Sequence, residues 1–464
     1  MAEISRLARE TGFVKRESKK VDALKFVKML LFDQLRYDQP SLQQHAFELL
    51  ADKDVNISKQ AIDKRFKTAA VDFISKLFES YLAHSIHCDS IATKLADKYK
   101  AVRVMDSTEF KLPDSLARDF PGYSASNALA CAAIQFEYDV ISKSISCMAI
   151  ENAKVSDKTY ADNRMYNIKA GELIIRDLGY YSIDSYQKIE KQGAFYISRL
   201  KSQISIYEQD ENGDYEELSL QTLIERIKKS GNPYVDQTVY IGAEGKKQVR
   251  LMAWLLEEDA QKKRLQKKES KTGKINSKDI LWSMLNVFIT NVPEEELTVQ
   301  QAYDLYKIRW QIELIFKIWK SILKIHLVRK MKPERVRCYL YGKLLWVLLC
   351  WDITVKFEPL VWEQKGRLLS LYKCYGLLKT YGHQLIRILF NARKKLKEWL
   401  LKMLHWFSDF GMKENKKGRK NLIELLQIIN DKPTKNVKFT AAKNARHHHQ
   451  FRGVFFEKLK HNEE

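Results

Sequence analysis

The sequence predicts an α/β protein in which a core of strands and helices lies between two helical regions. Three observations support this fold class. Apolar residues recur at helical spacing through the first hundred residues, short apolar runs typical of buried strands begin near residue 101, and the chain beyond 330 is again helical in pattern and becomes strongly basic. A chain of 464 residues, 45% of them hydrophobic, can fill roughly two to four such units. We therefore divide it into a helical region at 1–98, an α/β domain at 99–330 and a helical, basic region at 331–464.

The charge balance points to a polyanionic partner. The chain holds 80 Lys and Arg against 58 Asp and Glu, a formal net charge of +22. An excess of this size favours nucleic acid, with an acidic membrane surface second. The longest apolar run, Leu344 to Trp351, is too short to span a bilayer. Scattered cysteines and a charged N-terminus without a signal core indicate a soluble, intracellular protein.

The helical region at 1–98 contains a segment typical of the second helix of a helix-turn-helix. In VNISKQAIDKRFK, Ser58 is the expected N-cap, and Ala61, Ile62 and Phe66 form the buried side. Four outward-pointing residues are candidates for DNA contact, namely Lys59, Gln60, Lys64 and Arg65. An ordinary amphipathic helix with a solvated face explains the same pattern, and the sequence leaves both interpretations open.

Strands and helices alternate from about residue 101. Three strand-like runs (AVRVMD, ALACAAIQFEYDV and ISKSISCMAI) are followed by a helix, the run ELIIRD, a second helix and the run AFYISRL. The order β-β-β-α-β-α-β is the core order of the ribonuclease H-like fold. Residues 202–287 interrupt it, and we interpret them as a largely β insertion ahead of a long last helix from Val299 to Leu323.

Two acids stand where buried strands are expected to end. Asp106 follows the apolar run AVRVM, and Asp177 follows ELIIR. Carboxylates on neighbouring strands can share divalent cations, and Mg²⁺ prefers such oxygen ligands. Two ions about 4 Å apart can activate an attacking oxygen and stabilise a leaving one. A single aspartate in this context also commonly caps a turn, which is the simpler explanation for either acid alone.

The last helix carries a polar stripe within YKIRWQIELIFKIWK. At about 100° per residue, the spacing of its polar residues places on one side Tyr306, Arg309, Glu313, Lys317 and Lys320. The opposite, apolar side holds Ile308, Ile312, Ile315, Trp319 and Ile322. A carboxylate suits a metal ion, and the phenol, guanidinium and ammonium groups beside it suit phosphates. A solvent-facing ladder of i, i+4 salt bridges accounts for the same spacing.

The spacing Y-x2-R-x3-E-x6-K in this helix resembles the YREK signature of the insertion-sequence-four family of DDE transposases. Here it is formed by Tyr306, Arg309, Glu313 and Lys320. The contexts VMDST and IRDLGYYS resemble those of the family's first two acids, and the element order with its β insertion is also similar. The resemblance covers about residues 50 to 330 and ends before the C-terminal region.

This resemblance implies a ribonuclease H-like catalytic domain and a metal-dependent cut-and-paste reaction. Asp106, Asp177 and Glu313 would be the catalytic residues and the ligands of two Mg²⁺ (or Mn²⁺) ions. Water would cleave at the element end, the freed 3′-hydroxyl would form a hairpin, and the reopened end would join target DNA. The stripe residues Tyr306, Arg309, Lys317 and Lys320 would bind DNA phosphates.

The implied partners are double-stranded DNA, as terminal inverted repeats and as target, and a second protomer in a synaptic complex. We expect a cytoplasmic, nucleoid-associated protein. Two alternatives stay open: a transposase-derived DNA-binding regulator that does not cleave, and a metal-dependent, structure-selective nuclease that never joins strands.

Family members also stack an extruded base on a tryptophan placed just before the strand that corresponds to VFIT. In this chain that place holds Asn286, and Trp282 lies four residues earlier. We take Trp282 as the candidate for base stacking. Trp282 and Trp254 equally suit the role of core aromatics.

Overall fold

The structure, a computed structural model, describes residues 2–16, 20–84, 97–123, 128–243, 247–391 and 394–414. The chain divides into two compact units at 1–429 and 430–464, and everything described below belongs to the first. The basic segment expected at the end of the 331–464 region lies outside the described residues from 415 onward.

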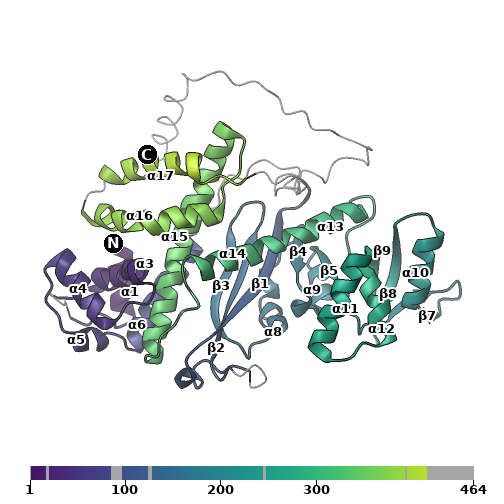
Figure 1. The fold of residues 1–464 in the computed structure, drawn as a ribbon, viewed down its shortest axis with the longest axis horizontal. Coiled ribbons are helices and arrows are strands. Elements are labelled where there is room, and N and C mark those ends of the chain that lie inside the picture. The colour runs from purple at the N-terminus through teal and green to yellow at the C-terminus, as the bar shows by residue number, and fades with distance from the viewer. Residues whose placement is uncertain are drawn as a thin grey trace. The chain divides into compact units, whose positions relative to one another are not determined.

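A sheet of ten strands runs through the described part of the chain (Figure 1). β1 runs parallel to β4, and β4 runs parallel to β5, whereas β2 is antiparallel to both β1 and β3. With α8 (Asp157–Asp162) between β3 and β4, and α9 (Ile183–Lys191) between β4 and β5, this half confirms the predicted ribonuclease H-like order. In order across the sheet the strands are β3 (Ile145–Asn152), β2 (Cys131–Asp139), β1 (Ala101–Lys111), β4 (Glu172–Arg176), β5 (Phe195–Arg199), β10 (Leu285–Thr290), β9 (Lys247–Leu255), β8 (Tyr234–Ile241), β6 (Ile206–Gln209) and β7 (Tyr215–Glu217).

The inserted residues continue the same sheet. β10 pairs antiparallel with β5 on one side and with β9 on the other, and one hydrophobic core includes Ile174 of β4, Tyr196 of β5 and Leu251 of β9. Besides four strands the insertion contains helices that the sequence pattern did not predict: α10 (Leu220–Lys229), α11 (Glu258–Thr272) and α12 (Ser277–Met284). Asn276 and Asp279 form a capping box that starts α12.

Helices from the two ends of the chain pack together. The long helix α15 (Pro333–Lys365) lies against α6, and its apolar run from Leu344 to Trp351 is largely buried. His45 links the two regions through Asp33 and Tyr339, with ring nitrogen to oxygen distances of 2.5 and 2.7 Å. The other helices of these regions are α1 (Ala2–Glu10), α2 (Ala23–Lys28), the π-helical turn η1 (Met29–Asp33), α3 (Gln34–Tyr37), α4 (Leu42–Lys53), α5 (Lys59–Asp63), α6 (Thr68–Ala83), α16 (Leu371–Asn391) and α17 (Lys394–Phe410).

The segment expected as a recognition helix is short. Ser58 caps α5 as predicted, because its hydroxyl accepts a hydrogen bond from the amide of Ala61 at 3.2 Å. The helix ends after five residues, at Asp63, and Ile62 and Phe66 are buried. Of the four candidates, Lys59, Gln60 and Lys64 are exposed and Arg65 is half-buried. Their contact with DNA stays a prediction, and α5 itself is shorter than a helix that reads a groove.

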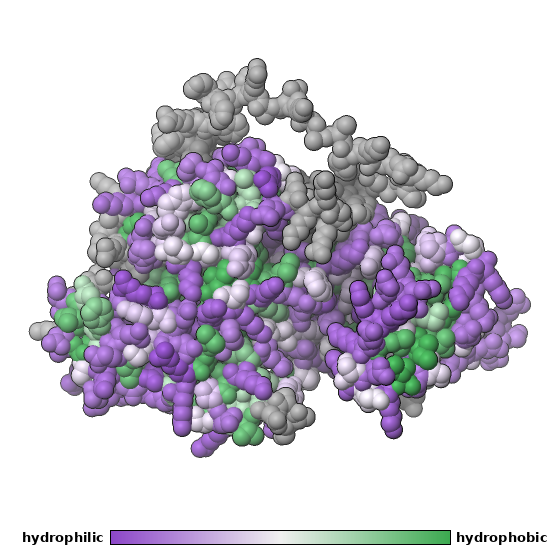
Figure 2. All heavy atoms as spheres, viewed as in Figure 1, coloured by the Kyte–Doolittle hydropathy of each residue, from purple (hydrophilic) through white to green (hydrophobic). Residues whose placement is uncertain are grey.

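Hydrophilic side chains cover most of the face shown in Figure 2. Among the helices that the structure describes, none combines the length and the apolar composition needed to cross a membrane.

Candidate active site

Asp106 and Asp177 lie side by side on two parallel strands. The pairing of β1 with β4 ends at Met105 and Arg176, so the two aspartates are the next residues on each strand. Asp177 directly follows β4, as predicted. β1 continues to Lys111 in its pairing with β2, so Asp106 stands inside the strand, at the point where β4 leaves it.

The helix predicted at 299–323 is present with a break in its hydrogen bonding at Arg309. A capping box of Thr298 and Gln301 starts α13 (Val299–Ile308), and α14 (Trp310–Ser321) follows. The backbone of Arg309 stays helical, at φ −50° and ψ −34°. The predicted apolar side is buried at Ile308, Ile312, Ile315 and Trp319, whereas Ile322 is only half-buried. With the apolar side packed inward, the polar stripe of the helix lies at the edge of the sheet where Asp106 and Asp177 stand.

Arg309 stands at the centre of the three predicted acids. Its Nη1 lies 3.1 Å from Oδ2 of Asp106, its Nη2 lies 2.8 Å from Oε1 of Glu313, and its Nε lies 3.9 Å from Oδ1 of Asp177. The hydroxyl of Tyr306 donates a hydrogen bond to the same Asp177 oxygen at 3.4 Å. Carboxylates from β1, from the end of β4 and from α14 therefore meet at one guanidinium.

Burial raises the pKa of Asp106 to about 6, and the neighbouring carboxylates of Asp177 and Glu313 add to this rise. The amide of Ser107, which donates to Asp106 at 2.9 Å, and the guanidinium of Arg309 oppose it. The site thus concentrates negative charge in a partly desolvated place, where a cation stabilises it. As the side chains stand, no three His, Cys, Asp or Glu residues within the described ranges are arranged to hold a metal ion.

A hollow of about 670 Å³ opens beside the acids along α14. Asp106 and Glu313 line it together with Lys317, Lys320 and Lys324. The Nζ of Lys320 donates to the carbonyl oxygen of Glu109 at 3.0 Å, which ties the end of α14 to β1. The salt-bridge ladder exists at Arg309 and Glu313, and the lysines of the stripe face the hollow.

The tryptophan candidates are half-buried and pack against other apolar side chains. Trp282, on α12, lies against the hydrophobic core of the insertion. Trp254 stacks on Phe288 with ring centroids 5.2 Å apart and an interplanar angle of 5°. Asn286, at the place of the family's tryptophan, is buried and accepts a hydrogen bond from Arg264 at 2.7 Å. A role of Trp282 in base stacking stays a prediction.

Sequence reasoning passed over Trp310. It directly follows Arg309 on α14, and 60% of it is exposed. An exposed indole ring is a flat surface on which a nucleic-acid base can stack. The signal was available in the sequence, because Trp310 falls outside the apolar positions of its helix.

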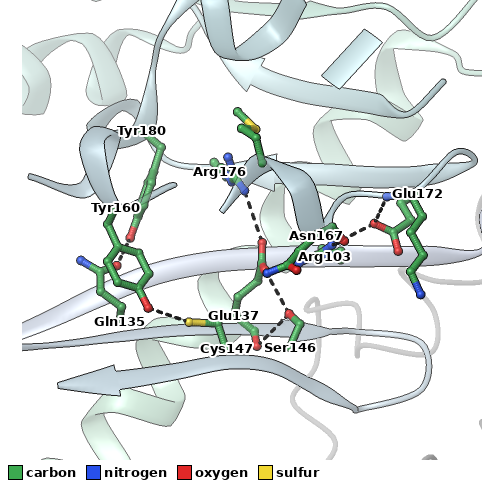
Figure 3. Close-up of polar contacts among 12 residues, drawn as sticks. Arg103, Gln135, Glu137, Ser146, Cys147, Tyr160, Asn167, Glu172, Arg176 and Tyr180 are labelled. Atoms are coloured by element: carbon green, nitrogen blue, oxygen red, sulfur yellow. Dashed lines mark hydrogen bonds and ion pairs between the residues drawn. The ribbon is translucent and has the colours of Figure 1, made fainter. Parts of the chain in front are cut away.

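A buried network of charges under the strand ends was also missed (Figure 3). Glu137 on β2 accepts hydrogen bonds from Arg103, Arg176 and Ser146, and Arg103 reaches Glu172 at 3.0 Å. The side chains of Glu137, Arg103 and Arg176 are 6% exposed or less. Since Arg176 directly precedes Asp177, this network fixes the strand end that carries the second acid.

The order of the sheet and the convergence of carboxylates from β1, β4 and α14 define the class of the protein: a ribonuclease H-like enzyme that acts on nucleic acid. Comparison with known proteins narrows this class. The family profile described as the transposase DDE domain matches residues 98–349.

Curated relatives extend over almost the whole chain. The transposase for insertion sequence element IS231E of Bacillus thuringiensis subsp. finitimus is 30% identical over 444 residues, which cover 92% of each chain. That for IS231B, from subsp. berliner, is 30% identical over 443 residues and 92% of each chain. The transposase for IS1151 of Clostridium perfringens is 28% identical over 445 residues, 92% of this chain and 93% of that one. The chain belongs to the insertion-sequence-four family of DDE transposases, enzymes that act on DNA and depend on a divalent metal ion.

Proposed function

We propose that this transposase cuts and pastes its element with Asp106, Asp177 and Glu313 as the catalytic ligands of two Mg²⁺ or Mn²⁺ ions. The observation that carries the proposal is their meeting at Arg309 from three separate elements. Carboxylates this close repel one another, and a shared cation offsets the repulsion. A solvent-facing salt-bridge ladder needs only Arg309 and Glu313, and does not require two strand acids at the same point.

The residues present fit a hard divalent cation. Carboxylate oxygens are the ligands that Mg²⁺ prefers, and each of the three acids has an oxygen within 4 Å of the guanidinium of Arg309. In the structure the guanidinium of Arg309 supplies the positive charge there. Ion binding therefore requires Arg309 to turn away from Asp106 and Glu313. When bound, the ions would activate the attacking oxygen and stabilise the leaving one.

Once Arg309 has turned away from the acids, its guanidinium would bind a DNA phosphate. Its Nε makes no hydrogen bond and lies 3.9 Å from Asp177, so a guanidinium that turns away from the acids would bring this donor to a phosphate oxygen. Tyr306 holds Asp177, and Lys317 and Lys320 line the hollow that a strand would cross. The exposed ring of Trp310 offers a stacking surface for a base of that strand. These groups would grip the end while it is bent into a hairpin.

Recognition of the inverted repeats is assigned to the N-terminal helices, and pairing of two DNA ends to a homodimer. The support for the first is the exposure of Lys59, Gln60 and Lys64 beside α5, together with the basic balance of the chain. The support for the second is the likeness of the sequence to its family. The target DNA would be captured by the same dimer.

The test uses a labelled duplex that carries the inverted repeat flanking the coding region. Asp106→Asn, Asp177→Asn and Glu313→Gln should each abolish cleavage in Mg²⁺ and leave binding of the duplex nearly unchanged, because they remove metal ligands and no phosphate contact. The exposed Asp114→Asn is the matched control and should cleave normally. Near-normal cleavage by any one of the three variants removes that residue from the catalytic set.

A second readout separates the transposase from its alternatives. The wild-type protein should join a free 3′-hydroxyl end to a second DNA. Cleavage without joining would indicate a nuclease, and binding without cleavage would indicate a regulator.

A further inference from the structure

The basic helix α11 starts at the sheet edge that carries the catalytic acids. β4 and β5 are parallel and end at this edge, after Arg176 and Arg199. β10 is antiparallel to β5, so its first residues, Leu285 and Asn286, lie at the same edge and pair there with the end of β9. The chain leaves β9 at Leu255 and enters α11 three residues later.

A half-buried arginine, Arg264, fixes α11 to this edge. Nη1 of Arg264 donates to the carbonyl oxygen of Leu285, and Nη2 donates to Oδ1 of Asn286, both at 2.7 Å. Lys268 adds an ion pair to Asp279 of α12 at 3.2 Å, and Figure 1 shows α11 and α12 side by side. Burial, with the charge of Arg199 adding to it, lowers the pKa of Arg264 to about 10. The positive charges of Arg199 and Arg264 therefore lie close together where α11 joins the sheet.

The side chains of α11 pack little, and the most covered of them, Arg264 and Leu265 included, are only half-buried. None of its fifteen residues is buried. Lys263, Lys267 and Lys271 follow one another at i, i+4 and i+8, so they form a stripe along one side of the helix. All three are exposed, and none has an ion-pair partner within the described ranges. Like charges at this spacing destabilise a helix, and a helix that is polar all round gains little from packing.

We infer that α11 binds the DNA backbone beside the scissile phosphate, with Lys263, Lys267 and Lys271 on successive phosphates of the strand that passes the insertion. The position of that phosphate rests on the proposed function. From Lys263 to Lys271 the helix rises about 12 Å at 1.5 Å per residue. That length matches about three to four phosphates along one strand. With the lysines of α14 on the other side, basic groups flank the acids along the sheet edge in both directions.

The experiment measures how salt weakens binding to a duplex of a few tens of base pairs, of arbitrary sequence. The variant carries Lys263→Gln, Lys267→Gln and Lys271→Gln. The control carries Lys169→Gln, Lys188→Gln and Lys191→Gln, three exposed lysines in the stretches that lead into the opposite ends of β4 and β5.

Each lost phosphate contact flattens the plot of log K against log salt by about 0.9. The α11 variant should therefore lose about 2.7 from the slope and bind roughly 10²-fold more weakly at 0.1 M salt. The control should keep the wild-type slope. An α11 variant with the wild-type slope, or with no greater loss than the control, overturns the inference.

Two further measurements keep the outcome decisive. The α11 variant should melt no lower than the wild type, because removal of a like-charge stripe relieves repulsion in the helix. The control variant should cleave DNA at the wild-type rate at saturating DNA and low salt, because none of its three lysines has a role in binding or catalysis. If the wild type itself never cleaves, the proposed function fails, while the change in slope still decides whether α11 binds DNA.

Discussion

Replacement of Arg309 by glutamine should tighten the binding of Mn²⁺ to the DNA-free protein. The guanidinium contacts Asp106 and Glu313 at 3.1 and 2.8 Å, in the place where ions would be shared. An ion can enter only by displacing it. Arg309→Gln removes the competing cation and leaves the three carboxylates to repel one another, which raises their affinity for a divalent cation.

The size of the effect follows from the two close contacts. The carboxylate of Asp106 is 17% exposed, so its ion pair keeps about 1 kcal/mol after screening by solvent. Glu313 is 41% exposed and contributes about half as much, and the longer contact to Asp177 contributes little. The resulting difference, about 1.5 kcal/mol, corresponds to a roughly tenfold lower Kd for the ion.

The assay is calorimetric titration of MnCl₂ into wild-type protein, Arg309→Gln and a control from the same helices. Lys307→Gln serves as that control, because Lys307 is exposed and pairs with Asp304 rather than with the three acids. The Kd should fall about tenfold in Arg309→Gln and stay unchanged in Lys307→Gln. Cleavage of DNA by Arg309→Gln should nevertheless be slower, since a phosphate contact is lost. Unchanged or weaker binding of Mn²⁺ by Arg309→Gln would show that Arg309 organises the acids instead of competing with the ion.

Three other changes have expected outcomes. Glu137→Ala should lower the free energy of unfolding by about 3–5 kcal/mol, because it leaves Arg103 and Arg176 buried without their shared partner; chemical denaturation that shows a loss under 1 kcal/mol would contradict this account. Lys320→Ala should slow hairpin formation more than first-strand nicking. Its cost in stability should be at most about 1 kcal/mol, because it removes one hydrogen bond to Glu109. Time courses that resolve nicked and hairpin products would refute the claim if both stages keep the wild-type rate. Trp310→Ala should leave the melting temperature unchanged, since the ring is largely exposed. It should weaken binding of the DNA end by about 1–3 kcal/mol. Equal affinity of variant and wild type in a fluorescence anisotropy titration would exclude stacking.

Local patterns were enough to predict the order of the core elements and the face that α13 and α14 present. Apolar runs of strand length mark β1 and β4, and the spacing of Ile308, Ile312 and Ile315 marks the buried side of the last helix. Each signal lies within a few residues of the chain, and the physics behind it is the burial of one face. Among the helices of the insertion, α11 gave no such signal, because it has no buried face and its charges resemble a solvated loop. α10 does have a buried face, at Leu223, Ile224 and Ile227, and this short signal was passed over.

Contacts between distant residues could not be predicted from one sequence. Arg309 meets Asp106 across 203 positions of the chain, and the stripe on the helix indicated only that Arg309 and Glu313 are neighbours. The sequence therefore suggested a phosphate clamp next to a metal site. The structure shows the guanidinium inside the group of acids, so Arg309 would take part in both proposed roles.

The polar residues of β2 show why a strand's alternation can mislead. Gln135, Glu137 and Asp139 alternate with apolar residues, a pattern typical of a face turned to water, yet every residue of β2 is buried. Two of them have partners in the loop and strand around the second acid: Glu137 holds Arg176, and Gln135 accepts a hydrogen bond from Tyr180 at 2.9 Å (Figure 3). Arg176 comes one residue before Asp177 and Tyr180 three residues after it. Buried polar groups must be paired, so this layer fixes the backbone on both sides of Asp177 more rigidly than apolar packing would. In the proposed role, in which Asp177 would share an ion with two other acids, it needs that rigidity, because a displacement of about 1 Å weakens both coordination and catalysis.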